Sequence, residues 1–343
     1  MNTLYFGDNL HVLREHIGTE TIDLVYLDPP FNSKATYNVL FKTPKGHESD
    51  AQITAFEDTW HWGMQAESEY DEILKSQNTD VAELLHALRS FLKENDIMAY
   101  LVMMANRLME LHRVLKPTGS LYLHCDPTAS HYLKIVLDTI FGVTNYKNEI
   151  IWKRINAKGN VQRKFGVVHD TILVYSKNLG QEIWNQGYRP LQLSYVDTMY
   201  RYIEEGTGRR YRLGDLTAPM SRASKGQIYE WKGKKPQSTR CWVYAIETME
   251  ELDKQGRIIY SKTGYPQYKR YLDEQLGEKL PDVWEDIQPA LGHEQLGYPT
   301  QKPLALLERI ISASSNEDDI VLDPFCAGAV LPFTRRRSCT ANG

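Results

Sequence analysis

Strand and helix patterns that alternate along the chain place the strongest constraint on its fold. Residues 22–27 form an apolar run with one acid, stopped by prolines, which is typical of a buried parallel strand. Residues 97–115 then carry Ile, Leu and Met at spacings of three and four, which predicts a helix with one buried face. The alternation is interrupted and returns near residue 300. The sequence therefore predicts an α/β fold with a parallel sheet, whose ligands bind at the carboxyl ends of the strands.

The interruption differs in composition from the rest of the chain. Residues 151–290 are rich in Tyr, Arg, Lys, Gly and Gln, and we predict an inserted domain over residues 179–290. Residues 151–235 hold 16 Lys and Arg against 7 Asp and Glu, a charge of +9, whereas the whole chain carries −4 and the remainder therefore −13. Such a local surplus favours a polyanionic partner, and the alternative is a solvated charged surface.

Composition excludes several classes of protein. The 343 residues are 42% hydrophobic and 24% charged, which is ordinary for a globular protein and unlike disordered or fibrous chains. The apolar stretches are shorter than the roughly 20 residues that a membrane span needs, and residues 1–8 show no basic region or cleavage site of a secretory signal. The cysteines form no CxxC pair, so we expect no zinc site, no disulfide framework and a cytoplasmic location. They are Cys125, Cys241, Cys326 and Cys339.

Two of the predicted strands end in an acid followed by proline, at Asp28–Phe31 and at Asp323–Phe325. Asp-Pro alone commonly just ends a strand, but Asp-Pro-Pro-Phe after a buried strand suits a particular chemistry. The exocyclic amine of a nucleobase is a poor nucleophile because its lone pair is delocalised into the ring. The carboxylate of Asp28 and the carbonyl of Pro29 can accept its two N–H bonds, while the ring of Phe31 stacks on a base flipped out of the duplex.

With these motifs the chain resembles the amino-group DNA methyltransferases that use S-adenosylmethionine. Asp28–Phe31 resembles the family's catalytic tetrapeptide, and Asp323–Cys326 resembles its cofactor motif. This order, with the catalytic motif first and a target recognition domain between the two, resembles the β class. Further stretches are similar to family motifs in the same order, namely Tyr5–Asn9, Leu115–Ser120, Asn148–Lys153, His169–Lys177 and Tyr298–Pro303.

The resemblance implies a circularly permuted, Rossmann-like methyltransferase sheet with an inserted target recognition domain. Residues 1–178 would be the first part of the catalytic core, residues 179–290 the recognition domain and residues 291–326 the cofactor-binding part of the core. The residues implied to bind and activate the amine are Asp28, Pro29, Pro30 and Phe31. The residues implied to bind the cofactor are Asp8, Asn9, Thr300, Gln301, Lys302, Asp323, Pro324, Phe325 and Cys326. No metal is implied.

Three of these assignments have simpler alternatives. In these alternatives, Thr300 only caps a helix, Asp8 only ends a strand, and Lys302 is only a charge on the surface. The implied partner is double-stranded DNA, held at its phosphates by basic residues of the insertion. These candidates are Arg209, Arg210, Arg212, Lys232, Lys234 and Lys235. A restriction subunit and a second copy of the chain are further partners that the resemblance suggests.

The first residue of the tetrapeptide bears on the target base. Family members with Asp at this position mostly methylate adenine N6, and those with Ser mostly methylate cytosine N4. Asp28 therefore favours a site-specific adenine-N6 methyltransferase that flips its base and transfers the methyl group directly. The alternatives are cytosine-N4 methylation and a DNA-binding protein that has lost catalysis.

The last residues depart from the family pattern. After Cys326 the family continues with a glycine-rich turn, a helix and a strand whose final acid binds the cofactor ribose. Residues 327–343 instead contain Pro332 and three consecutive arginines. We predict that a small insertion or deletion near codon 326 put this aberrant tail out of frame and truncated the sheet, which would leave an inactive copy. The alternative is a natural divergent tail.

Overall fold

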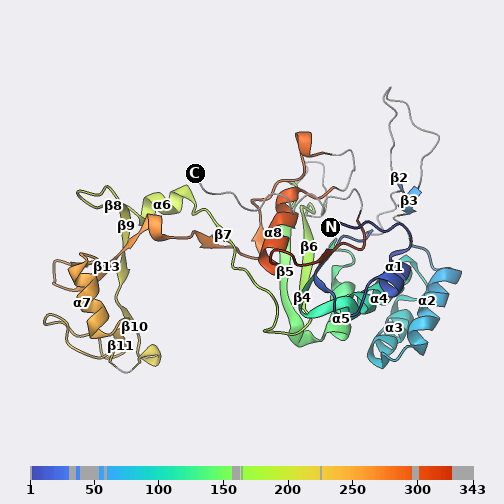
Figure 1. Ribbon diagram of the computed structural model, residues 1–343, viewed down its shortest axis with the longest axis horizontal. Coiled ribbons are helices and arrows are strands. Elements are labelled where there is room, and N and C mark those ends of the chain that lie inside the picture. The colour runs from blue at the N-terminus through green and yellow to red at the C-terminus, as the bar shows by residue number, and fades with distance from the viewer. Residues whose placement is uncertain are drawn as a thin grey trace. The chain divides into compact units, whose positions relative to one another are not determined.

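The structure is a computed structural model of the chain. It describes residues 2–30, 36–38, 54–57, 60–156, 163, 165–224, 226–295 and 301–326. The chain divides into two compact units, which are described one at a time (Figure 1). The first unit comprises residues 1–187 and 281–343, and the second comprises residues 188–280.

The second unit is shorter at both ends than the insertion expected at 179–290. The backbone N–H of Asn185 donates to the carbonyl of Ala313 at 2.8 Å, which holds this segment against the first unit. At the other end, Val283 and Trp284 form a strand of the main sheet. Both flanking segments therefore belong to the core by their backbone hydrogen bonds.

The first unit is built on a six-stranded sheet in the order β15-β5-β6-β4-β1-β16 (Figure 1). The strands are β1 (Ile22–Leu27), β4 (Leu115–Cys125), β5 (Tyr146–Lys153), β6 (His169–Ser176), β15 (Val283–Trp284) and β16 (Val321–Leu322). The strand predicted at 22–27 is β1, and all six of its residues are buried. It pairs in parallel with both β4 and β16, so it lies inside the sheet, as its continuous apolar run indicated.

The predicted α/β fold with parallel strands is confirmed, and the structure adds one antiparallel strand, β6, which runs antiparallel to both β4 and β5. The described part of the connection between β5 and β6 contains no helix. A parallel pair of neighbours needs a crossover, usually helical, whereas antiparallel neighbours can be joined directly. The sheet is therefore mixed, with one parallel group formed by β4, β1 and β16 and another formed by β15 and β5.

Helices cover both faces of this sheet (Figure 1). On one face, Val25 and Leu27 of β1 pack in a cluster with α4 (Asp96–Val114) and α5 (Ser130–Phe141). Three more helices contact α4 from outside, namely α1 (Asn9–His16), α2 (Met64–Lys75) and α3 (Thr79–Leu92). On the other face, Leu24 and Tyr26 pack with α8 (Leu304–Ser314). The helix predicted over 97–115 is α4.

The remaining strands of the first unit, β2 (Thr36–Asn38) and β3 (Thr54–Glu57), pair with each other and form a separate ribbon.

The second unit has its own antiparallel sheet and core. The sheet has the order β12-β13-β9-β8, with β8 (Tyr202–Ile203), β9 (Arg210–Asp215), β12 (Ile258–Tyr260) and β13 (Pro266–Tyr271). Two small ribbons pair β7 (Tyr188–Arg189) with β14 (Glu278–Lys279) and β10 (Thr217–Pro219) with β11 (Arg240–Trp242). The described part of this unit also contains the α-helices α6 (Leu193–Met199) and α7 (Ile246–Lys254). Its buried cluster consists of Leu216, Trp231, Trp242, Met249 and Ile258.

Three further findings concern only the described residues. No helix among them is long and apolar enough to cross a membrane. Among their cysteines, Cys125 and Cys241 are buried free thiols, and Cys339 lies outside the described residues. They contain no group of three or more His, Cys, Asp or Glu arranged to hold a metal ion.

A candidate active site at the ends of β1 and β16

Two acids lie at the same edge of the main sheet because the strands before them are parallel neighbours. Val25 lies opposite Leu322, so that Asp28 and Asp323 both follow at the carboxyl edge. The prolines after Asp28 are buried and cannot continue a strand ladder, and they thus fix the turn at this position. Open α/β sheets bind their ligands at this edge.

Lys302 brings a positive charge to these acids. It comes two residues before α8, and its Nζ lies 2.5 Å from Oδ2 of Asp28. The Lys302 side chain is 10% exposed and that of Asp28 is 21% exposed, so Lys302 is not a solvated surface charge. Shielding from water strengthens the attraction between the two charges. Among the described residues, no donor is bonded to Oδ1 of Asp28, which leaves this oxygen for a ligand.

Asp323 is held in an environment that disfavours its charge. Burial raises the pKa of Asp323 to about 7, and the negative charge of Asp28 acts in the same direction. The backbone N–H of Phe325, which donates to Asp323 Oδ1 at 3.0 Å, and the charge of Lys302 both oppose this rise. A cationic ligand beside Asp323 would favour its ionised form.

The start of α1 is fixed to the same edge. Asp8 caps α1, since its Oδ1 accepts from the N–H of Leu10 at 2.7 Å, and no strand precedes it among the described residues. The alternative that Asp8 only ends a strand is therefore wrong. Arg107 of α4 donates to both carboxylate oxygens of Asp8 at 3.2 Å and to Oδ1 of Asn9 at 2.6 Å. Asn9 in turn donates to the carbonyl of Pro324 at 2.9 Å, directly after Asp323.

The structure thus brings together some of the predicted site residues and leaves others apart or undescribed. Asp28, Lys302 and Asp323 form one group, and Asn9 contacts the turn after β16. Gln301 directs its amide to the carbonyl of Glu294 at 2.7 Å. Phe325 packs against the main core, and Cys326 is half-buried. Phe31 and Thr300 lie outside the described residues, and so does the segment 327–343 that was predicted to be an aberrant tail.

A buried polar network under this site was missed by sequence reasoning. Tyr26 Oη lies 3.1 Å from Nδ1 of His124, and Nε2 of His124 lies 3.2 Å from Oδ2 of Asp170. Arg154 donates to the other oxygen of Asp170 at 2.9 Å. Burial lowers the pKa of His124, and the charge of Lys302 lowers it further, so the ring is neutral at neutral pH. Polar residues in otherwise apolar strands were the available signal, since Tyr26 lies in β1 two positions before Asp28.

Most of the basic residues proposed to contact DNA are engaged with acids of the second unit. The ion pairs are Arg209 with Asp273 and Glu274, Arg210 with Asp197, Lys232 with Asp253, and Lys235 with Glu230. Arg212 and Lys234 have no such carboxylate partner among the described residues. Exposed ion pairs contribute only about 0–1 kcal/mol to stability, so a DNA phosphate can replace the acid. A basic residue whose charge is already balanced by an acid nevertheless attracts DNA less than an unpaired one.

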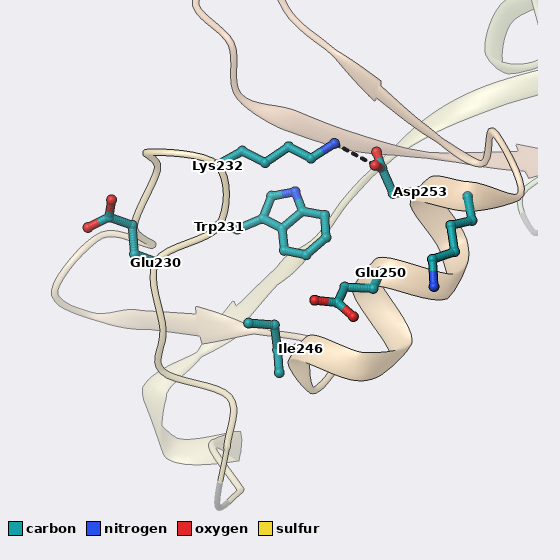
Figure 2. A pocket seen from close by; sticks show the side chains of 7 residues that line it. Glu230, Trp231, Lys232, Ile246, Glu250 and Asp253 are labelled. Atoms are coloured by element: carbon teal, nitrogen blue, oxygen red, sulfur yellow. Dashed lines mark hydrogen bonds and ion pairs between the residues drawn. The ribbon is translucent and has the colours of Figure 1, made fainter.

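One of these pairs lines a shallow hollow of about 330 Å³ in the second unit. Figure 2 shows Lys232 extending past the ring of Trp231 to Asp253. Acids outnumber bases among its lining residues, which are Glu230, Trp231, Lys232, Ile246, Glu250, Asp253 and Lys254. This charge balance does not suit a polyanion.

Comparison with known families decides what kind of protein carries this site. A family model described as DNA methylase, N6_N4_Mtase, matches residues 22–329 and so includes both Asp28 and Asp323. The chain belongs to the N6_N4_Mtase family of DNA methylases. Asp8 and Asn9 precede the matched residues.

Several curated proteins are similar to this DNA methylase family member. The Type II methyltransferase M.EcaI of Enterobacter cloacae is 35% identical over 240 residues, which cover 68% of this chain and 51% of that protein. The Mod subunit of the Type III restriction-modification enzyme StyLTI of Salmonella typhimurium is 26% identical over 344 residues, which cover 96% of this chain and 48% of that protein. The chain spans about half the length of these two relatives.

Among solved structures, the M1.HpyAVI–SAM complex is 14% identical with a TM-score of 0.35, covering 94% of this chain and 82% of that one. The cytosine-N4-specific PvuII DNA methyltransferase is 12% identical with a TM-score of 0.36, covering 93% of this chain and 72% of that one. Both are distant likenesses to this methylase family member.

Proposed function

We propose that this chain transfers the methyl group of S-adenosylmethionine to adenine N6 in double-stranded DNA. The observation that carries the proposal is the position of Asp28, at the carboxyl end of a buried parallel strand, beside Lys302 and next to β16, which Asp323 follows. Membership of a DNA methylase family supports the same reaction class.

Asp28 has the geometry to activate an amine. Lys302 holds Oδ2, and Oδ1 is left to accept one N–H of the target amine. The carbonyl of Pro29 is a second acceptor at the same turn, where the proline that follows provides no competing N–H. Two acceptors on one amino group draw its lone pair out of conjugation toward the reacting carbon. The base must be flipped out of the duplex to reach this edge of the sheet.

The residues present fit S-adenosylmethionine in charge. The cofactor carries a sulfonium, an ammonium and a carboxylate, and the edge offers two acids and one ammonium in Asp28, Asp323 and Lys302. The raised pKa of Asp323 fits a site that a cation completes. When bound, the cofactor supplies an electrophilic methyl group. Asn9 and Pro324 would shape the adjoining wall, held together by their hydrogen bond.

Adenine is the proposed base because the tetrapeptide begins with Asp28. Cytosine N4 is the second candidate, since its amine has the same chemistry and Asp28 and Pro29 would accept from it in the same way. A DNA-binding protein without catalysis is the third candidate.

We also propose partners on the basis of relatives. Two similar proteins are named as Mod subunits of the Type III restriction-modification enzymes StyLTI and EcoP15I. A restriction subunit is therefore a proposed partner of this chain, and a second copy of the chain is proposed on the family resemblance. We propose that the chain and these two partners act in the cytoplasm, where the DNA is.

The proposal is tested by identifying the methylated nucleoside. The full chain is incubated with labelled S-adenosylmethionine and unmethylated genomic DNA, and the DNA is then digested to nucleosides and separated. We expect N6-methyladenine. N4-methylcytosine would replace the proposed base, and DNA binding without any labelled nucleoside would support the third candidate.

A matched pair of variants assigns the chemistry to Asp28. Asp28→Asn loses one charge and the ion pair with Lys302, and we expect methyl transfer to fall by at least about 100-fold with DNA binding retained. Asp71→Asn makes the same chemical change at an exposed position of α2 and should transfer methyl groups as the unaltered chain does. Equal activity of the two variants would contradict the assigned role of Asp28.

A further inference from the structure

Two arginines of the second unit lie directly opposite each other on adjacent strands. The register of β9 and β13 pairs Arg212 with Arg270, so that both side chains leave the same face of the sheet. Like charges at directly opposite positions of antiparallel strands are destabilising. A folded domain keeps such a pair most readily where an anion lies between or beside them.

No acid on the described part of the chain neutralises this pair. Neither guanidinium forms an ion pair with a carboxylate there, and Nε of Arg212 is buried without a hydrogen-bond partner. The guanidinium of Arg212 lies 5.7 Å from the ring centre of Tyr200, which holds it without satisfying its donors. Arg270 is exposed. The pair therefore offers unused donors to a ligand.

The opposite face of the same sheet shows the contrast. Lys269 is a neighbour of Arg270 in β13 and points to the other face, where its Nζ lies 2.7 Å from Glu204. Arg209, which precedes β9, lies 2.8 Å from Asp273 on that face. The cations of that face are thus matched by acids. On the face of Arg212 and Arg270, Arg210 is paired with Asp197, whereas Arg212 and Arg270 have no carboxylate partner among the described residues.

Gly214 makes room for one of the two arginines. A Cβ added at Gly214 would lie 2.7 Å from Nε and 3.3 Å from Cδ of Arg270, which is closer than packed atoms allow. Arg270 therefore lies across β9 at the one position of that strand without a side chain. A larger residue at 214 would displace the guanidinium.

We propose that Arg212 and Arg270 bind the sugar–phosphate backbone of DNA, each guanidinium contacting a phosphate. The assignment deepens the proposed function, because it names the DNA contact of the second unit and adds Arg270, which lies outside the basic stretch of the sequence. Guanidinium groups bind phosphates with paired, charge-assisted hydrogen bonds, and such contacts position a protein on DNA without reading its sequence. The charge surplus of residues 151–235 is consistent with this partner.

The test measures DNA binding by fluorescence anisotropy without cofactor, so that a failure of methyl transfer does not affect it. Arg212→Gln and Arg270→Gln are compared at several salt concentrations, on duplexes of unrelated sequence. We expect each variant to weaken binding about 10-fold on every duplex, and the slope of log affinity against log salt to fall by about 0.9 for each lost phosphate contact. The double variant should lose about twice as much slope.

Two further variants keep the result interpretable. Arg257→Gln changes an arginine that is already paired with Glu274 in the same unit, and it should bind DNA like the unaltered chain. Gly214→Ala retains both arginines but displaces Arg270, and it should weaken binding less than Arg270→Gln does. Thermal melting of both arginine variants should be unchanged or higher, because a like-charge pair is relieved.

Unchanged affinity and salt slope in both arginine variants would overturn the proposal. A loss confined to one DNA sequence would also overturn it, since that result indicates that an arginine reads a base. A fall in melting temperature that accounts for the lost binding would show that the pair is structural instead.

Discussion

The side-chain amide of Asn9 donates a 2.9 Å hydrogen bond to the carbonyl of Pro324, which lies 315 positions later in the chain. Arg107 orients that amide by donating to its oxygen, so the guanidinium in α4 sets which way Asn9 presents its N–H group. Only 4% of the Arg107 side chain is exposed. The turn after Asp323 is therefore supported by a buried arginine that contacts Asp8 but, in the described part of the chain, neither Asp28 nor Asp323.

Arg107 should accordingly affect cofactor binding more than the chemical step. Arg107→Lys keeps the charge but loses the planar fork that reaches Asp8 and Asn9 together, so the turn at Pro324 loses its support. We expect KM for S-adenosylmethionine to rise about 10-fold with a smaller change in kcat. Arg107→Met leaves Asp8 and Glu69 unpaired and should cost about 3 kcal/mol of the free energy of unfolding. Steady-state kinetics and urea unfolding measure the two effects, and an unaltered KM in Arg107→Lys would contradict the supporting role.

Lys302 should control both the rate and its dependence on pH. Lys302→Met removes the cation that holds Asp28, and we expect kcat to fall about 100-fold. The charge of Lys302 also lowers the pKa of Asp323, so its removal should shift the acid limb of the pH profile of kcat/KM toward higher pH.

Lys302→Arg restores a charge at the same place and should recover part of the rate and of the profile. A purely structural lysine would change the rate in Lys302→Met without moving the pH profile, and that outcome would exclude the electrostatic role.

Much of the main sheet was predictable because its signals are local. The apolar run before Asp28 became β1, and the periodic residues from 97 became α4, each within a few residues of the expected bounds. The polar segment before α4 gave a weaker signal. Its α2 buries only Ala66, Tyr70 and Ile73 among charged residues, so one narrow face carries the whole apolar pattern.

The contacts of the site were less predictable because they depend on strand register. Tyr26, His124 and Asp170 meet only once β1, β4 and β6 are paired, and they are 98 and 46 positions apart in sequence. The direction of β6 decides that pairing, and no single segment encodes it. Asp28, Asp323 and Lys302 were identified from motifs, but the contact between Lys302 and Asp28 required the structure to place α8.

Asp323→Asn should stabilise the cofactor-free protein at high pH. The pKa of Asp323 rises on folding from 3.8 to about 7, so the folded state binds this proton more tightly than the unfolded state does. The contribution of Asp323 to the free energy of unfolding is therefore greatest below about pH 4. It declines as the pH rises to about 7 and stays low above that. The full shift corresponds to about 4 kcal/mol, and the residual solvent exposure of the side chain reduces our expectation to about 2 kcal/mol.

Urea unfolding of Asp323→Asn at pH 8 and near pH 4 checks this sign. We expect the free energy of unfolding to rise by about 2 kcal/mol at pH 8 and hardly at all near pH 4. We also expect the variant to bind S-adenosylmethionine more weakly. Asp71→Asn, at its exposed position, should show no gain at either pH. A gain of equal size at both pH values would mean that the charge of Asp323 is not its cause.

His124 should have the opposite dependence on pH. Burial, aided by the charge of Lys302, lowers the pKa of His124 below 6.5, so the unfolded state binds this proton more tightly. The contribution of His124 to the free energy of unfolding is complete above about pH 6.5. It falls as the pH approaches the lowered pKa of the folded state, by up to about 1.4 kcal/mol per pH unit. Burial raises the pKa of Asp170, but the bond from His124 and the charge of Arg154 outweigh this and leave that carboxyl ionised throughout the window.

His124→Asn isolates this effect, because its amide keeps a hydrogen-bonding group beside Tyr26 but does not titrate. The variant should be less stable than the unaltered chain at pH 8 by about 2 kcal/mol, since a smaller side chain fills the same buried space. The difference should shrink as pH falls from about 6.5 to 5, while the contribution of Asp323 is common to both proteins and cancels. Unfolding curves at four pH values across that window measure it. Parallel stability profiles would show that His124 is not held neutral by burial, and the network under Asp28 would then need a different protonation.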